Sequence, residues 1–112
     1  MEEGIPCKQI KVSNRFYNSF DQVYDFGFET FGYFQAERYK QLIRQSLDTL
    51  QDFYMAYPEC RFLATKSRIY RNIILDSHLI IYRITSEHIE VLDIIHSASS
   101  ICKIRSIRKV RC

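Results

Sequence analysis

The sequence predicts a single α+β domain in which a helical hairpin packs on one face of an antiparallel sheet, with the element order β-α-α-β-β-β. Two long segments with helical spacing lie in the first half of the chain, separated by a glycine. Three short segments rich in β-branched residues follow, joined by turns of two or three residues. A chain of 112 residues, 46% hydrophobic and 26% charged, is sufficient for one buried core.

The chain begins with a predicted strand and helix. Apolar residues alternate with lysines over residues 8–13, which is typical of a strand. Ser13 then provides a helix N-cap, and aromatic residues recur at helical spacing over residues 17–31. Gly32 favours the end of this helix, although Gly27 lowers helix propensity near its centre.

A second, longer helix is predicted over residues 35–57, where apolar residues recur every three or four positions opposite a polar face. Pro58 ends this helix. The short connection between the two helices predicts an antiparallel hairpin. The apolar stripe consists of Tyr39, Leu42, Ile43, Leu47, Leu50, Tyr54 and Met55.

After a loop over residues 58–67, three strands are predicted over residues 68–75, 78–85 and 89–96. The short turns between them predict an antiparallel meander, with the helical hairpin covering one of its faces. Strict alternation in the last strand places two sets of side chains on opposite faces. These sets are Ile89, Val91, Asp93 and Ile95 on one face, and Glu90, Leu92, Ile94 and His96 on the other.

Charge is distributed unevenly along the chain. Residues 1–100, the predicted domain, contain eleven Lys and Arg against thirteen Asp and Glu, whereas residues 101–112 contain five basic residues and no acid. This basic C-terminal tail favours an acidic partner, either protein or nucleic acid; a solvated, partly disordered end is the alternative. Its apolar residues recur every third position, which fits neither a regular α-helical face nor a strand.

Neither a metal nor a cofactor is predicted. The four cysteines form no C-x-x-C pair, and the three histidines complete no zinc-finger spacing, so reduced thiols are expected. No apolar run approaches the ~20 residues of a membrane span. The N-terminal stretch MEEGIPCKQI is acidic and lacks an apolar signal core, so we expect a cytoplasmic protein.

The residues that can support chemistry are mainly basic. Arginine can hold a phosphate through two hydrogen bonds, and a histidine beside it can act as general acid or base in RNA cleavage. The alternative is that the arginines lie on a solvated sheet face and that the histidine is a hydrogen-bonded strand end. His78 and His88 fall at turns and are expected at the surface; most aromatic residues are expected in the core. The basic candidates are Arg61, Lys66, Arg68, Arg71 and Arg83, with His96 at the end of the last strand.

The order of motifs over residues 8–100 resembles the RelE/ParE superfamily of bacterial type II toxin–antitoxin toxins, and is closest to the ParE branch, often labelled plasmid stabilisation proteins. The matching motifs are YPECR (57–61), SRIY (67–70), HLIIYRI (78–84) and IEVLDIIH (89–96). The resemblance implies a toxin that inhibits DNA gyrase without bond-breaking chemistry and is neutralised in a complex with a cognate antitoxin. RelE-like members instead cut messenger RNA on the ribosome.

Two positions favour the ParE-like alternative. RelE-like nucleases place an arginine three residues before the tyrosine of the middle strand, where this chain has Leu79 before Tyr82, and basic residues after the last strand, where it has SASS (97–100). Three alternatives stay open: a gyrase inhibitor, an endoribonuclease in which His96 is the acid/base and Arg71 or Arg83 holds the phosphate, and a non-toxic partner-binding protein. The residues expected to contact the target or antitoxin are Arg61, Arg68, Arg71, Arg83, His96, Lys103, Arg105 and Arg108.

Overall fold

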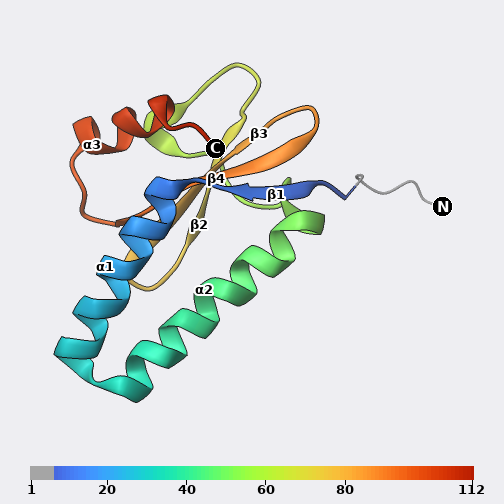
Figure 1. Ribbon diagram of the computed structural model, residues 1–112. Coiled ribbons are helices and arrows are strands. Elements are labelled where there is room, and N and C mark those ends of the chain that lie inside the picture. Colours follow the sequence, from blue (N-terminus) through green and yellow to red (C-terminus); the bar gives the residue numbers. More distant parts are fainter. Residues whose placement is uncertain (1–6) are drawn as a thin grey trace.

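The computed structural model describes residues 7–112; residues 1–6, which include much of the acidic N-terminal stretch and the start of the predicted domain, lie outside the described residues. The α+β class and the order β-α-α-β-β-β are confirmed, with one more helix at the C-terminus (Figure 1). The elements are β1 (Gln9–Val12), α1 (Asn14–Phe31), α2 (Tyr33–Phe53), the 3-10 turn η1 (Arg61–Leu63), β2 (Tyr70–Ile74), β3 (His78–Ile84), β4 (His88–His96), α3 (Ile101–Ser106) and the 3-10 turn η2 (Ile107–Lys109). Within residues 7–112, no helix is long and apolar enough to cross a membrane.

The four strands form one sheet in the order β1-β4-β3-β2. Strands β2, β3 and β4 make the predicted antiparallel meander. Strand β1, in contrast, pairs in parallel with β4, from Gln9 opposite His88 to Val12 opposite Val91. The sheet is therefore mixed. Parallel pairing of β1 and β4 needs a long connection, which the helical hairpin and the two intervening strands provide.

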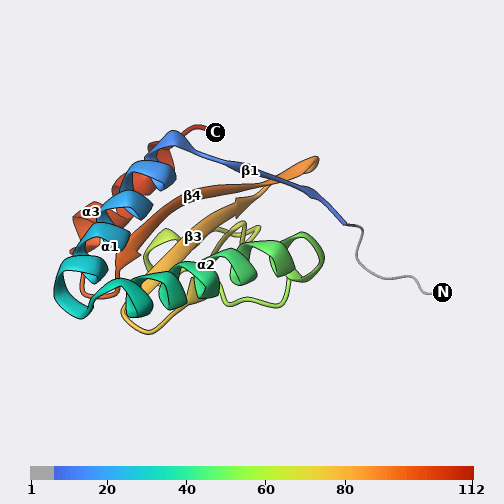
Figure 2. The same ribbon diagram turned by 60° about the horizontal axis from the view of Figure 1, so that its bottom comes forward.

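The two long helices form the predicted hairpin and pack on one face of the sheet (Figure 2). Gly32 separates them with a φ of 90°, and its N–H donates to the Phe28 carbonyl at 2.9 Å. This left-handed conformation explains why glycine ends α1. Leu42 and Met55, predicted in the buried stripe, are instead exposed: the buried positions of α2 are Ala36, Ile43 and Leu50, a narrower stripe, and Met55 lies beyond the end of the helix.

A β-bulge interrupts the alternation of β4. Ile81 lies opposite Asp93 and Tyr82 lies opposite Val91, so Leu92 is the extra residue. Beyond it the faces exchange: Ile94 joins the hairpin-side core, and Ile95 packs on the opposite side. The prediction for these two residues was wrong because strict alternation does not survive an inserted residue.

The bulge is tied to the start of α1 by Ser13, which is 1% exposed. The Ser13 hydroxyl donates to the Leu92 carbonyl at 2.6 Å and accepts the N–H of Phe16 at 3.0 Å, while the Ser13 N–H donates to the Val91 carbonyl at 3.0 Å. The predicted N-cap is thus confirmed, and the same side chain satisfies a carbonyl that the bulge leaves outside the sheet ladder.

Residues 101–112 cover the other face of the sheet together with η1, so the domain has three layers. They are ordered, and do not form the solvated end that the sequence left as an alternative. The threefold spacing suits a short α-helix that passes into a 3-10 turn, which has three residues per turn. The buried residues of this second core are Cys60, Leu63, Tyr70, Ile81, Leu92, Ile95, Ile104, Ile107 and Val110.

We predict that Ser13→Ala lowers the free energy of unfolding by about 2 kcal/mol, since it removes a helix cap and leaves the buried Leu92 carbonyl without its hydroxyl donor. Urea denaturation measures the change. Ser46→Ala is the matched control: its hydroxyl donates to the Leu42 carbonyl on the exposed side of α2, and a change within about 0.5 kcal/mol is expected. Equal effects of the two substitutions would contradict the role given to Ser13.

The two described glycines are predicted to respond to alanine with opposite signs. Gly32→Ala should destabilise by about 1 kcal/mol, because alanine disfavours a φ of 90°. Gly27→Ala should stabilise by about 0.5–1 kcal/mol, because Gly27 lies inside α1 and an added Cβ meets nothing within 4 Å. Thermal and urea unfolding of both variants test this, and stabilisation by Gly32→Ala would contradict it.

Candidate functional site

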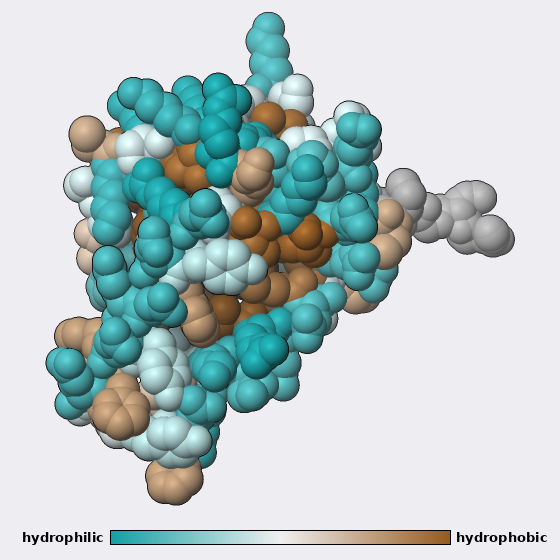
Figure 3. Space-filling view, in the orientation of Figure 1, coloured by the Kyte–Doolittle hydropathy of each residue, from teal (hydrophilic) through white to brown (hydrophobic). Residues whose placement is uncertain are grey.

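A groove of about 580 Å³ opens between the arms of the helical hairpin and the end of the sheet. Figure 3 shows apolar residues, in brown, in the recess between the two helices. The apolar part of the lining includes Phe20, Val23, Phe26, Phe31, Ile43 and Ile94. Phe26 and Phe31 are about two-thirds exposed, at 65% and 66%, so the groove is open to a partner.

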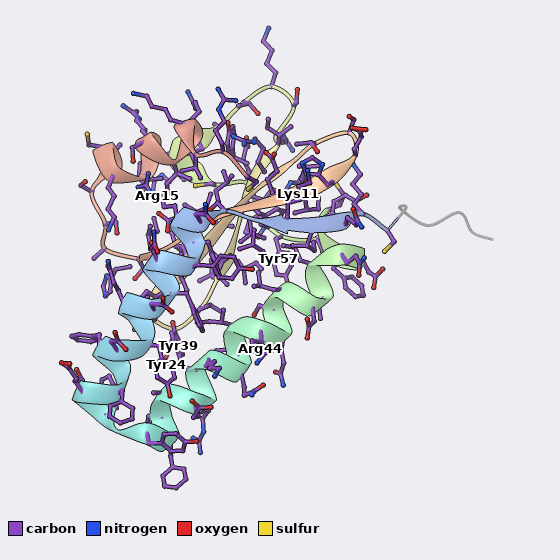
Figure 4. The ribbon with its side chains drawn as sticks, in the orientation of Figure 1. Lys11, Arg15, Tyr24, Tyr39, Arg44 and Tyr57 are labelled. Atoms are coloured by element: carbon purple, nitrogen blue, oxygen red, sulfur yellow. The ribbon has the colours of Figure 1, made fainter. Side chains whose placement is uncertain are left out.

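Tyrosines from both helices line the groove, and Figure 4 shows Tyr24 and Tyr39 in the space between α1 and α2. The Tyr24 hydroxyl donates to the carboxylate of Glu37, which raises the pKa of Tyr24 to about 12. Lys40 lies over the Tyr24 ring, 5.6 Å from its centroid, and its Nζ is 3.9 Å from Glu37. This cluster links α1 to α2 along one wall of the groove.

One end of the groove carries two histidines and a lysine. His78 and His96 are partners across β3 and β4, with ring centroids 5.5 Å apart, and Lys103 of α3 lines the same end. The Tyr39 hydroxyl lies 2.8 Å from Nδ1 of His78. Burial, and then the neighbouring His96, lower the pKa of His78. Nδ1 of His96 accepts the Ala98 N–H at 3.0 Å, so the proton of the neutral ring is on Nε2.

Arg71, a predicted site residue, holds the main chain in place. Its guanidinium donates to the carbonyls of Met55 at 2.9 Å, Tyr57 at 3.0 Å and Arg68 at 3.1 Å. These bonds connect the end of α2 to the beginning of β2. These three bonds use Nε and one terminal nitrogen, which leaves the two N–H groups of the other terminal nitrogen.

Arg83 lies on the opposite face of the sheet and anchors the C-terminal segment. Its Nε donates to Glu90 at 2.6 Å, and its terminal nitrogens donate to the Tyr70 hydroxyl at 3.3 Å and the Val110 carbonyl at 3.1 Å. Burial raises the pKa of Glu90, but hydrogen bonds from His88 and Arg83 outweigh it, so the net pKa is lowered. Arg83 is thus part of a partly buried ion pair that fixes residues 108–110 to the sheet.

The structure does not bring the three residues of the nuclease alternative together. Arg83 lies opposite Glu90, and His96 lies six residues further along β4, a separation of about 20 Å in a strand. Arg71 points to the hairpin side and Arg83 to the C-terminal side of the sheet. Arg71 is paired with Tyr82, which lies opposite Val91, five residues before His96, so a phosphate held by either arginine would be far from His96.

The other predicted basic residues are exposed in the C-terminal layer. Arg61 begins η1, Lys66 lies in the loop after η1, and Arg68 precedes β2. The other three, Lys103, Arg105 and Arg108, are on α3 and η2. Of the complete predicted set, only His96 and Lys103 line the groove. Within residues 7–112, no group of three or more His, Cys, Asp or Glu side chains is placed to hold a metal ion.

The prediction from the sequence did not include most of the residues that line the groove. It placed His78 at the surface, whereas the ring is partly buried against Tyr39 and His96. It also placed most aromatic residues in the core, but those around the hairpin tip are exposed, because the tip extends past the sheet (Figure 1). The sequence did contain a feature that predicts this exposure. Five aromatic residues fall within nine positions, which is too many for one buried helical stripe: Phe26, Phe28, Phe31, Tyr33 and Phe34.

Residues 10–101 match the family described as the ParE toxin of type II toxin–antitoxin system, parDE. The chain belongs to this family. The resemblance of its motifs to the ParE branch is thereby confirmed. The chain is also similar to a solved structure titled "Chromosomal ParDE TA system from P. aeruginosa", with a TM-score of 0.67, 18% sequence identity, and coverage of 80% of this chain and 96% of that chain. This likeness shows a shared fold. No curated protein matches the sequence.

We predict that His78 makes stability depend on pH. Its pKa in the folded chain is below the ordinary 6.5, so the unfolded chain binds the proton first as the pH falls. The stabilisation associated with neutral His78 is complete above the pKa of this residue in the unfolded chain. It is lost as the pH falls from that value toward the pKa of His78 in the folded chain. His78→Gln should therefore reduce the fall in unfolding free energy between about pH 7.5 and 5.5, measured by urea titration.

Ser77→Ala is the control for this measurement. Ser77 is exposed, precedes His78 and carries no group that titrates in this range. The variant should keep the slope of the parent chain. An unchanged slope in His78→Gln would show that the imidazole does not contribute.

Proposed function

We propose that this ParE family member is the toxin of a toxin–antitoxin pair, and that a segment of its antitoxin fills the groove between the hairpin and the sheet. Aromatic and aliphatic side chains from both helices and from β4 line the groove, which is about 580 Å³ in volume, and such a lining suits the apolar face of an amphipathic helix. Asp76 lines one end of the groove beside His78, His96 and Lys103, and the two imidazoles and the ammonium group there can donate hydrogen bonds to an acidic residue on that segment. The single observation that supports this assignment most directly is the open groove in a chain of this family.

We further propose that the free toxin inhibits DNA gyrase and works in the cytoplasm, where that enzyme acts. The resemblance to the ParE branch supports this target. The separation of Arg71 and Arg83 from His96 argues against the endoribonuclease alternative, because phosphoryl transfer needs cations placed at the reacting phosphate. No bond-breaking step is assigned to the chain.

Induced expression in a bacterium tests the target. Growth and plasmid supercoiling are scored together, with and without the neighbouring open reading frame. We expect growth arrest with altered supercoiling, relieved when the neighbour is co-expressed. Arrest with normal supercoiling would reject gyrase, and unchanged growth with retained binding to the neighbouring protein would leave a partner-binding protein without toxicity.

The groove itself is tested with exposed residues, so that the core stays intact. Phe26→Ser with Phe31→Ser should weaken binding of the antitoxin at least tenfold, since burial of an aromatic side chain stabilises a complex by about 1–3 kcal/mol. Isothermal titration calorimetry of the purified pair measures the affinity. Phe53→Ser is the control, because Phe53 is 57% exposed at the far end of α2 and does not line the groove. Equal losses in the two variants would place the binding site elsewhere.

A further inference from the structure

The outer surface of the C-terminal layer has a single sign of charge. Its residues come from two segments, 61–68 and 97–112, which together contain eight basic residues and no Asp or Glu. All eight are exposed. We call this surface the basic face; it consists of Arg61, Lys66, Arg68, Lys103, Arg105, Arg108, Lys109 and Arg111.

Packing of the second core produces this surface. Ile104, Ile107 and Val110 point into the core at every third position, so the basic residues between them must point outward. Leu63 of η1 is buried in the same core, which brings the loop with Arg61 beside α3. Figure 3 shows hydrophilic residues, in teal, gathered over α3 and this loop at the top of the view.

The carboxylates close to this layer are already engaged. Glu90 is paired with Arg83 and His88, and Glu59 accepts the N–H of Thr65 at 3.1 Å. Asp93 is buried and paired with Arg15. Within residues 7–112, no carboxylate lies within ion-pair distance of the eight cations. Arg61 and Arg108 lie over the rings of Phe62 and Tyr70, and both arginine side chains are also exposed.

The face also lacks the apolar anchors that protein partners require. Among its two segments, Ile101 is the one large hydrophobic side chain that is substantially exposed, at 46%. Protein interfaces depend on a buried apolar or aromatic centre, whereas binding to a nucleic-acid backbone needs only positive charge spread over several phosphates. Five of the eight cations are arginines, which can bind phosphate oxygens through two hydrogen bonds.

We propose that the basic face binds the phosphodiester backbone of nucleic acid, with duplex DNA as the ligand, independently of the groove and of the gyrase assignment. Residues 102–112 lie outside the 10–101 match to the family, so family membership does not assign them a role. The hairpin groove and the basic face are on different layers of the domain, apart from Lys103, which reaches the end of the groove. One chain can therefore hold a protein partner and a nucleic acid.

Fluorescence anisotropy with a labelled 20-base-pair duplex of random sequence tests the proposal on the full chain. If about five phosphates are contacted, the affinity should fall by about 500-fold between 50 and 200 mM salt, because each contact releases a counterion. Arg105→Glu with Arg111→Glu should lower the affinity at least tenfold and reduce the salt slope by about two. A labelled single-stranded RNA of the same length is titrated in parallel, and tighter binding of the RNA would overturn duplex DNA as the ligand.

Arg38→Glu with Arg44→Glu is the matched control. Both arginines are exposed on α2, and the double substitution changes the net charge by the same amount. The control should keep its DNA affinity within threefold of the parent chain. If both double variants lost the same DNA affinity, the loss would follow from the change in net charge alone, and the proposal would be overturned. The same holds if the parent chain binds neither nucleic acid, or if polyglutamate of equal charge displaces the duplex equally well.

Discussion

The hydroxyl of Ser13 connects the start of α1 to the bulge in β4, and the groove depends on this connection. By donating to the Leu92 carbonyl while capping α1, it fixes where the hairpin leaves the sheet. The bulge at Leu92 in turn moves Ile94 to the hairpin side. Without the extra residue, strict alternation would place Ile95 on the hairpin side and move Ile94 and His96 to the opposite face of the sheet.

Because of the bulge, consecutive residues of β4 pack into two different hydrophobic cores. Leu92 and Ile95 support the layer formed by η1, α3 and η2, while Ile94 supports the helical hairpin. Asp93, between them, is buried and is neutralised by Arg15 from α1, which also donates to Ser106 of α3. A buried carboxylate requires such a partner, so this contact ties all three layers together at one point.

Two of the arginines that the sequence singled out serve the fold. Arg71 and Arg83 are distinguished from the surface arginines by their acceptors, which are main-chain carbonyls and Glu90. Guanidinium groups suit this task because they present several donors in a fixed plane. Residue type alone cannot show whether an arginine faces a carbonyl or solvent, so the sequence could not separate these two from Arg105 or Arg108.

The sequence alone determined the local elements, because capping, glycine conformation and apolar periodicity act over a few residues. The features predicted in this way were the cap at Ser13, the end of the first helix at Gly32, both helices, the meander and the motifs of the ParE family. The tertiary structure decided what depends on distant contacts. These are the parallel pairing of β1 with β4, the bulge at Leu92, the packing of residues 101–112 and the meeting of His78, His96 and Lys103 at one end of the groove. Each of these joins segments far apart in the chain, and no local pattern encodes which partner a segment will find.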